Sequence, residues 1–276
     1  MKTLSVLFLL SAFVIKGTAQ PYIDLVSCRY TASPGFTSTS KANVLNYANL
    51  SSTLPLKFKN NDYLILSPFF EKWTAQMNTE HPKQCYYGLG LPLTYLKNIK
   101  ESNTSFSATA ILRMNDETID KHGKLQIGGA ALMLAKKSES MTWKFGLYVN
   151  GDLFGIFIIP LAGIDWKIDE KSNLFGILPA NLTYERKAGN KLYYGLNFRT
   201  FTNSYAKDTG YWRVDENQLG AFADQYLTKH LVVNAEFGSS ILRKIRTGTE
   251  RKAKENWNIK DNYYLKISFA YRMRLR

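Results

Sequence analysis

The sequence lacks any long hydrophobic run after its first residues. The longest later run is 153–164, which is twelve residues long and is interrupted by Gly155, Pro160 and Gly163. A helix that crosses a bilayer needs about 20 mostly apolar residues. We therefore do not expect a transmembrane helix in the body of the chain.

Cysteine is also scarce. Only Cys28 and Cys85 occur, and they form no C-x-x-C pair. Two cysteines are too few for a disulfide framework or a cysteine-based zinc site. Whether these two pair with each other or remain separate thiols stays open at this point.

No motif for catalysis is present. Of the three histidines, His230 opens an expected strand near Asn234, and the nearby Ser239 and Ser240 complete no evident triad with it. The sequence also has no phosphate-binding glycine loop and no nucleophile elbow. We expect no catalytic residue, no metal and no cofactor, and we do not expect an enzyme.

The N-terminus has the pattern of a secretory signal. Lys2 is followed by an apolar stretch over 4–15 and then by the small residues Gly17-Thr18-Ala19. This pattern predicts a signal peptide over 1–19 and a mature domain over 20–276. The protein is then exported across the inner membrane.

Positive charge is concentrated near the C-terminus. The whole chain carries a formal charge of +14, and eleven Lys or Arg residues face only three acids between Arg243 and Arg276. An exported chain seldom meets nucleic acid, so we expect no nucleic-acid partner, and anionic lipid headgroups are better partners. The segment 243–260 is predicted as an outward-facing loop, and its lipopolysaccharide-binding candidates are Arg251, Lys252 and Lys254; a solvated loop without a partner is the alternative.

The rest of the chain reads as strands separated by turns. Many of the strands exceed the usual five or six residues and match the nine to eleven that cross a bilayer at a tilt. The thirteen expected strands are 22–31, 43–58, 62–73, 86–98, 104–115, 124–136, 141–149, 153–168, 173–186, 191–202, 211–227, 230–243 and 262–275.

Apolar and polar residues alternate within these strands. In the last one, Leu265, Ile267 and Phe269 share one face, whereas Lys266 and Ser268 share the other. A soluble sandwich would bury the apolar face, and a membrane barrel would turn it to lipid. The barrel is favoured by export, by strand length and by the 38 aromatic residues. Several tryptophans lie near strand ends, where an aromatic girdle at the headgroup level is expected: Trp73, Trp143, Trp166 and Trp212.

We therefore predict an all-β fold, a closed antiparallel transmembrane β-barrel of about twelve strands, with fourteen as the next choice, because single-chain barrels have even strand numbers. The thirteen expected strands break this rule. Assigning turns alternately to the two sides of the membrane from the N-terminus and from the C-terminus gives results that conflict between Asp116 and Gly151.

Two segments carry a family resemblance. They are "FIIPLAGIDWKIDEKSNLFGILPANLTYERK" and "QLGAFADQYLTKHLVVNAEFGSSILRK", and the most specific part is Pro160 to Trp166 followed by Leu178-Pro179. They resemble a family of Gram-negative outer-membrane β-barrel proteins known only as a domain of unknown function. The resemblance implies a barrel and an outer-membrane location, but it implies no activity. The chain departs from the general outer-membrane pattern by ending in Leu275-Arg276 rather than in an aromatic residue.

The predicted function is that of an outer-membrane barrel, either a narrow pore or passive transporter for small solutes or a structural membrane protein. Its partners are then outer-membrane lipid, including lipopolysaccharide, and the barrel-insertion machinery. The alternatives are a secreted or periplasmic β-sandwich or lipocalin-like binding protein, and a lipid-modifying outer-membrane enzyme. The lumen-facing candidates are Asp165, Lys167, Asn181, Glu185, Asn197, Arg199, Asn234 and Glu236.

Overall fold

The computed structural model describes residues 21–33, 44–76, 83–99, 102–118, 124–249, 252–258 and 262–275. The predicted signal peptide lies outside these residues. The strands are β1 (Tyr22–Ser33), β2 (Val44–Ser52), β3 (Leu54–Lys57), β4 (Tyr63–Leu66), β5 (Phe69–Gln76), β6 (Gln84–Asn98), β7 (Thr104–Asp116), β8 (Lys124–Ser138), β9 (Met141–Asp152), β10 (Gly155–Lys167), β11 (Ser172–Leu178), β12 (Asn181–Lys187), β13 (Leu192–Lys207), β14 (Gly210–Tyr226), β15 (Leu231–Thr249), β16 (Lys252–Asn258) and β17 (Asn262–Arg274).

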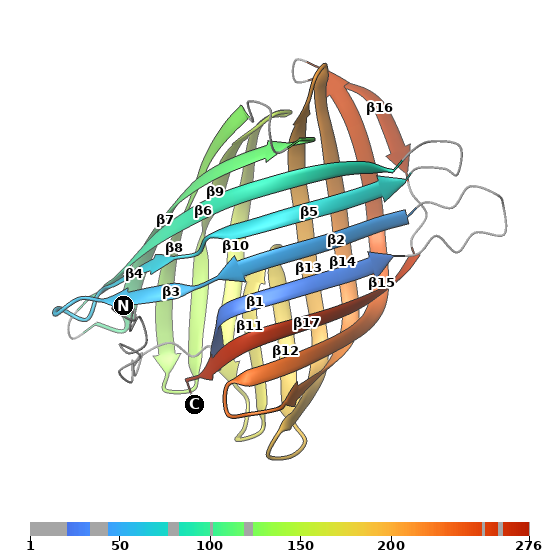
Figure 1. Ribbon diagram of the computed structural model, residues 1–276. Helices are drawn as coiled ribbons and strands as arrows, with labels where there is room; N and C mark the ends of the chain where they lie inside the picture. The colour runs from blue at the N-terminus through green and yellow to red at the C-terminus, as the bar shows by residue number, and fades with distance from the viewer. Residues whose placement is uncertain are drawn as a thin grey trace, which may run out of the picture.

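These elements form one closed antiparallel barrel of fourteen strands (Figure 1). Three pairs of elements are each one interrupted wall strand: β2 with β3, β4 with β5, and β16 with β17, the last pair running along β15. The barrel closes where β1 pairs with β17 from Tyr22↔Arg274 to Ala32↔Leu265. The predicted barrel is confirmed, and the sandwich alternative is wrong.

The predicted number of twelve strands is wrong. The error in strand counting also does not lie between Asp116 and Gly151, where the counts from the two ends conflict. Strands β7 to β9 follow one another without a missing element. The single strand expected over 173–186 is a hairpin of two seven-residue strands, β11 and β12, joined at Pro179-Ala180. Proline lacks the N–H that a central strand position needs, so Pro179 marks the turn.

The outer face of the barrel is apolar. On β17, Leu265, Ile267 and Phe269 are 50%, 44% and 53% exposed, whereas Lys266 and Arg272 on the opposite face are each 5% exposed. A closed barrel satisfies its backbone hydrogen bonds within the sheet, so such a face is stable against hydrocarbon. Among the described residues, no helix is long and apolar enough to cross a membrane. The architecture is that of a transmembrane β-barrel.

Both ends of the described chain lie together, since the N–H of Leu275 donates to the carbonyl of Pro21 at 2.9 Å. We call this the termini end and the opposite one the far end. The turns 168–171 and 188–191 at the termini end are short, whereas ten residues of sequence separate the far ends of β1 and β2.

The far ends of β13 and β14 lie inside the barrel. We call residues 203–214 the inner hairpin. Four consecutive residues of it, Asn203 to Ala206, are buried, which means that both faces of the strand are covered. Ala206 pairs with Asp116 of β7, almost opposite in the ring of strands, and its carbonyl accepts a hydrogen bond from the N–H of Glu117 at 3.1 Å.

The turn of the inner hairpin requires glycine. Gly210 has a φ of +115°, and a Cβ there would lie 2.0 Å from the carbonyl oxygen of Gly248. Only glycine adopts this conformation without strain. The Asp208-Thr209-Gly210 turn thus positions the hairpin against β15.

Two of the four tryptophans expected in a headgroup girdle are instead interior. Trp73 and Trp212 are 1% and 2% exposed, because both pack in the cluster around the inner hairpin. Trp143 lies on the outer face, where it stacks on Phe145 with a centroid distance of 6.2 Å. Alternation alone does not distinguish an aromatic residue facing lipid from one facing a filled lumen.

The prediction of a loop over 243–260 is also wrong. The described residues of this segment continue β15 to Thr249 and form β16 from Lys252 to Asn258, and these two strands pair with each other at the far end. Two of its basic residues have acidic partners: Arg243 with Glu216 at 2.8 Å and Arg246 with Asp215 at 3.2 Å. Part of the basic excess is therefore internally neutralised.

Candidate functional site

One side of the lumen is lined by paired charges. We call these residues the ionic wall, which extends over β12–β15, β17 and β1. Four carboxylates are matched by four cations there. The members are Asp24, Glu185, Asp224 and Glu236 with Arg199, Lys266, Arg272 and Arg274.

Arg272 is a centre of this wall. Its guanidinium contacts Asp24 and Asp224, each at 2.5 Å, and lies 3.6 Å from the centroid of the Tyr22 ring. Asn234 donates to the second oxygen of Asp224 at 2.6 Å. The two carboxylates come from β1 and β14, so the arginine ties together strands on both sides of β17.

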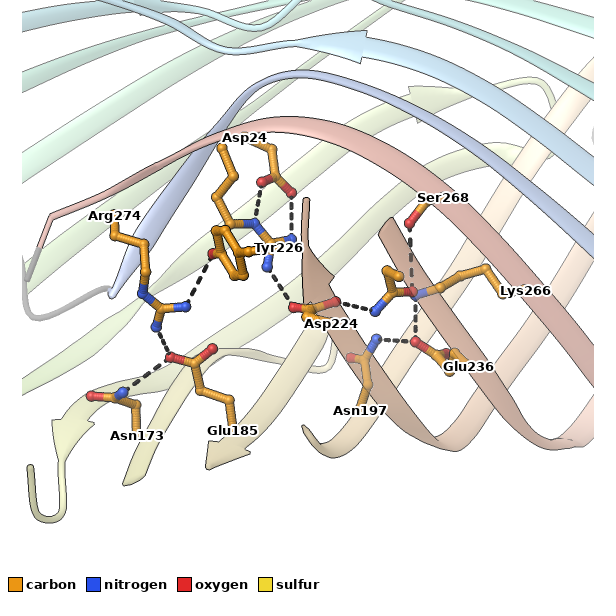
Figure 2. Close-up of polar contacts among 12 residues, drawn as sticks. Asp24, Asn173, Glu185, Asn197, Asp224, Tyr226, Glu236, Lys266, Ser268 and Arg274 are labelled. Carbon is orange, nitrogen blue, oxygen red and sulfur yellow. Dashed lines mark hydrogen bonds and ion pairs between the residues drawn. The ribbon is translucent and has the colours of Figure 1, made fainter. Parts of the chain in front are cut away.

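Two further groups extend the wall, and Figure 2 shows them together with the first. Arg274 contacts Glu185, which also accepts a hydrogen bond from Asn173 at 3.0 Å. Lys266 contacts Glu236, which also accepts from Asn197 at 3.1 Å. Every one of these charges has a partner, so removing one member of a pair would leave a buried charge without its counter-ion.

The eight lumen-facing candidates lie in different parts of the barrel. Glu185, Asn197, Asn234 and Glu236 are buried in the ionic wall, and Arg199 reaches it at 3.8 Å from Glu236. Asp165 is buried elsewhere, where it pairs with Lys144 at 2.7 Å.

The other two candidates lie apart from the wall. Asn181 is exposed at the β11–β12 turn, and the structure gives Lys167 an intermediate exposure near the termini end. Six of the eight therefore have a side-chain partner inside the barrel, whereas Asn181 accepts a hydrogen bond from the N–H of Ile177 and borders a cavity in the lumen, and Lys167 lies near the termini end.

Sequence reasoning missed the anchors of the inner hairpin. Glu71 on β5 accepts hydrogen bonds from the hydroxyls of Tyr47 and Tyr205, at 2.9 and 2.6 Å, and from Asn203 at 3.1 Å. Asn203 in turn accepts from Arg113 of β7 at 2.7 Å. These contacts attach the hairpin to the strands across the lumen.

Aromatic packing supports the same attachment. Trp212 stacks on Tyr86 of β6 with centroids 4.1 Å apart and an interplanar angle of 6°, and Tyr205 lies 5.5 Å from Trp212. On the other side of the hairpin, Arg213 lies 3.7 Å above the ring of Phe154. The far half of the lumen is therefore filled by protein.

Beside this plug lies a cavity of about 620 Å³. Its volume falls in the range of small-molecule sites. Part of its lining is small or apolar, and we call that part the apolar wall. It consists of Ala130, Leu132, Tyr148, Phe157, Ile159 and Leu161 on β8, β9 and β10.

A signal for the apolar wall is present in the sequence. β10 is apolar on both faces, since outward Ile156 and Ile158 alternate with inward Phe157 and Ile159. In a barrel with a polar lumen, one face of each strand is expected to be polar. A doubly apolar strand therefore indicates an apolar compartment inside.

The other residues singled out in the sequence are the lipid-binding candidates and the histidines. Of the three lipid-binding candidates, Arg251 lies outside the described residues, and Lys252 and Lys254 lie on β16. The ring of His230 lies against the backbone carbonyl of Arg272 at 3.3 Å, whereas Ser240 donates to Glu216, so these two side chains form no pair. His81 and His122 lie outside the described residues.

The described residues contain no cluster of three or more His, Cys, Asp or Glu that could hold a metal ion. The two cysteines are free thiols on β1 and β6.

Comparison with solved structures gives distant likenesses. The COG4313 outer membrane channel from Pseudomonas putida F1 has 12% sequence identity and a TM-score of 0.45, with 96% of this chain and all of that chain covered. A second chain, from a study of the in-meso crystallization of membrane proteins, has 6% identity and a TM-score of 0.33, with 92% and 83% covered. The comparison with curated proteins gives no match.

A family model matches residues 71–276, which include all strands from β5 to β17 except the first two residues of β5. This range contains the inner hairpin, the apolar wall and all of the ionic wall except Asp24. The chain therefore belongs to the family described as domain of unknown function DUF6268.

Proposed function

We propose that this protein is a narrow outer-membrane channel for small solutes, closed in the present conformation by the inner hairpin. The observation that carries the proposal is the cavity of about 620 Å³ inside a barrel with an apolar outer face. A purely structural barrel has no need of an internal compartment. A single lumen that is filled by protein in one part and open in another is the arrangement expected of a gated passage.

The proposed orientation places the termini end in the periplasm and the far end outside the cell. Single-chain outer-membrane barrels have short periplasmic turns and longer outer loops, and the distribution of turns here supports that assignment. The inner hairpin then closes the lumen from the outer side. Insertion by the outer-membrane barrel machinery and contact with lipopolysaccharide belong to this proposal.

The test is conductance in a planar bilayer. Tyr205→Ala removes both a hydroxyl donor to Glu71 and an aromatic partner of Trp212, so the hairpin should loosen. We expect rare or small current steps from the wild type and at least threefold more open time from the variant. Tyr194→Ala is the matched control, since Tyr194 lies on the outer face of the same strand.

One observation favours a second candidate, a structural barrel. The ionic wall matches every cation with a carboxylate and so would stabilise a lumen that conducts nothing. That candidate predicts silence from the wild type and from both variants, with retained heat-modifiable gel mobility. Silence of that kind overturns the channel proposal.

A further inference from the structure

The barrel wall has a notch between β10 and β13. β11 ends at Leu178 and β12 begins at Asn181, so this hairpin covers only the half of the wall near the termini. β10 pairs with β11 from Ala162 to Lys167, and β13 pairs with β12 no further than Arg199. Beyond these points, within the described chain, the 155–161 part of β10 pairs only with β9.

The notch lies within the apolar outer belt. Beside it, the outward-facing Ile156 and Ile158 are 75% and 58% exposed. An unpaired strand edge is costly in hydrocarbon and is tolerated where it lines a cavity. Pro160 sits on this edge strand, the position in a sheet where proline is accepted.

The cavity borders this notch. Its lining includes Ile159 and Leu161 of β10, Pro179 and Ala180 of the β11–β12 turn, and Phe201 of β13. These residues form the sides and the floor of the notch. The cavity therefore borders the notch, which lies in the lipid-facing part of the wall.

A cation lies inside the same cavity. Arg113 borders it. Among the described residues, its guanidinium donates one hydrogen bond, to Asn203, and it lies 5.5 Å from the ring centroid of Phe69. Its Nε is buried and has no partner among the described residues. Glu71 also borders the cavity but is already bound by Tyr47, Tyr205 and Asn203.

We propose that the cavity binds an amphipathic carboxylate with an unbranched apolar tail, of the fatty-acid class, that enters from the bilayer through the notch. The carboxylate accepts hydrogen bonds from Arg113, which suits it because a guanidinium presents several donors in a fixed plane. The tail lies along Phe157, Ile159 and Phe201 and leaves through the notch. This proposal rests on the proposed function, because it names the solute class of that channel.

The first test needs no variant. The wild-type protein in detergent is photolabelled with dodecanoate that carries a diazirine at its tail end, and the labelled peptides are mapped. We expect labels concentrated in 156–161, 177–181 and 199–203, displaced by excess unlabelled dodecanoate. Labels spread over the outer belt, with none displaced, overturn the proposal.

The second test separates the headgroup from the tail by calorimetric titration with dodecanoate and dodecanol. Arg113→Gln should weaken dodecanoate binding at least tenfold and leave dodecanol binding unchanged, and Arg113→Lys should restore part of the loss. Arg186→Gln is the control, because Arg186 is exposed near the termini end. Equal loss of both ligands, or no loss, overturns the role of Arg113.

If Arg113→Gln does not fold, the wild-type comparison still decides, since dodecanoate should bind at least tenfold more tightly than dodecanol. Current steps without specific photolabelling refute this inference and leave the channel intact. Specific photolabelling without current steps refutes the channel alone.

Discussion

The two sides of the lumen differ in how they are built. The ionic wall binds its strands together through charges that all have partners, whereas the apolar wall turns Leu132, Ile159 and Leu161 toward empty space. A buried charge is stable only with its partner, and an apolar side chain beside a cavity has already lost contacts on one side. The ionic wall is therefore where mutation should destabilise the barrel, and the apolar wall is where mutation should change what the cavity holds.

The largest effect is expected from Arg272→Leu. It leaves Asp24 and Asp224 without their common cation in the interior, and breaking a buried pair costs about 3 to 5 kcal/mol. Urea unfolding of the protein in liposomes measures the loss. Arg186→Gln is the control, since its 3.9 Å contact with Asp169 is about half exposed and should contribute at most about 1 kcal/mol. Similar losses of unfolding free energy in both variants would show that the ionic wall contributes no more to stability than an exposed ion pair.

The outer face provides a second contrast on β17. Ile267→Arg places a charge against lipid and should cost about 2 to 4 kcal/mol near the midplane. Ser268→Arg points inward beside Asn234 and should cost less if the lumen there admits water. The same unfolding assay compares them, and equal costs would contradict the assignment of the faces.

Two isoleucines test the difference between filled and open lumen. Ile245→Ala removes a side chain that is 2% exposed in the cluster around the inner hairpin, and should cost about 2 to 4 kcal/mol. Ile159→Ala should cost less than about 1 kcal/mol because Ile159 already borders the cavity. A larger loss at Ile159 in the unfolding assay would mean that the compartment is packed in solution.

The smallest effect is expected at the termini end, outside the membrane. The carboxylate of Asp62 accepts a hydrogen bond from the hydroxyl of Tyr95 at 2.6 Å and another from the N–H of Asn98 at 3.0 Å. These two bonds lower the pKa of the Asp62 carboxyl. Their stabilisation is present above the ordinary carboxyl pKa of about 4 and is lost as the pH falls through the lower folded value.

Asp62→Asn should therefore lower the midpoint of thermal unfolding slightly at pH 7 and not at pH 2. Heat-modifiable gel mobility at the two pH values measures this difference. A variant that is equally destabilised at both would show that packing, rather than the carboxylate charge, is responsible.

Much of the barrel was predictable because side chains alternate between the faces of a strand. The period of two in Leu265, Ile267 and Phe269 fixes which residues share a face, and strand length together with the absence of a long apolar run turns that face to lipid. The same alternation put Glu185 and Glu236 on the polar face. These properties are local, so the sequence by itself determined them.

Other properties depended on which strands meet across the lumen. Tyr205 and Trp212 alternate like any lipid-facing aromatic residues, yet they are buried, because β13 extends past the short β12 and turns inward to β7. Glu71, Arg113 and Asn203 are far apart in the chain and converge only through that turn. No local period encodes such contacts, so the tertiary structure alone decided the plug, the cavity beside it and the notch in the wall.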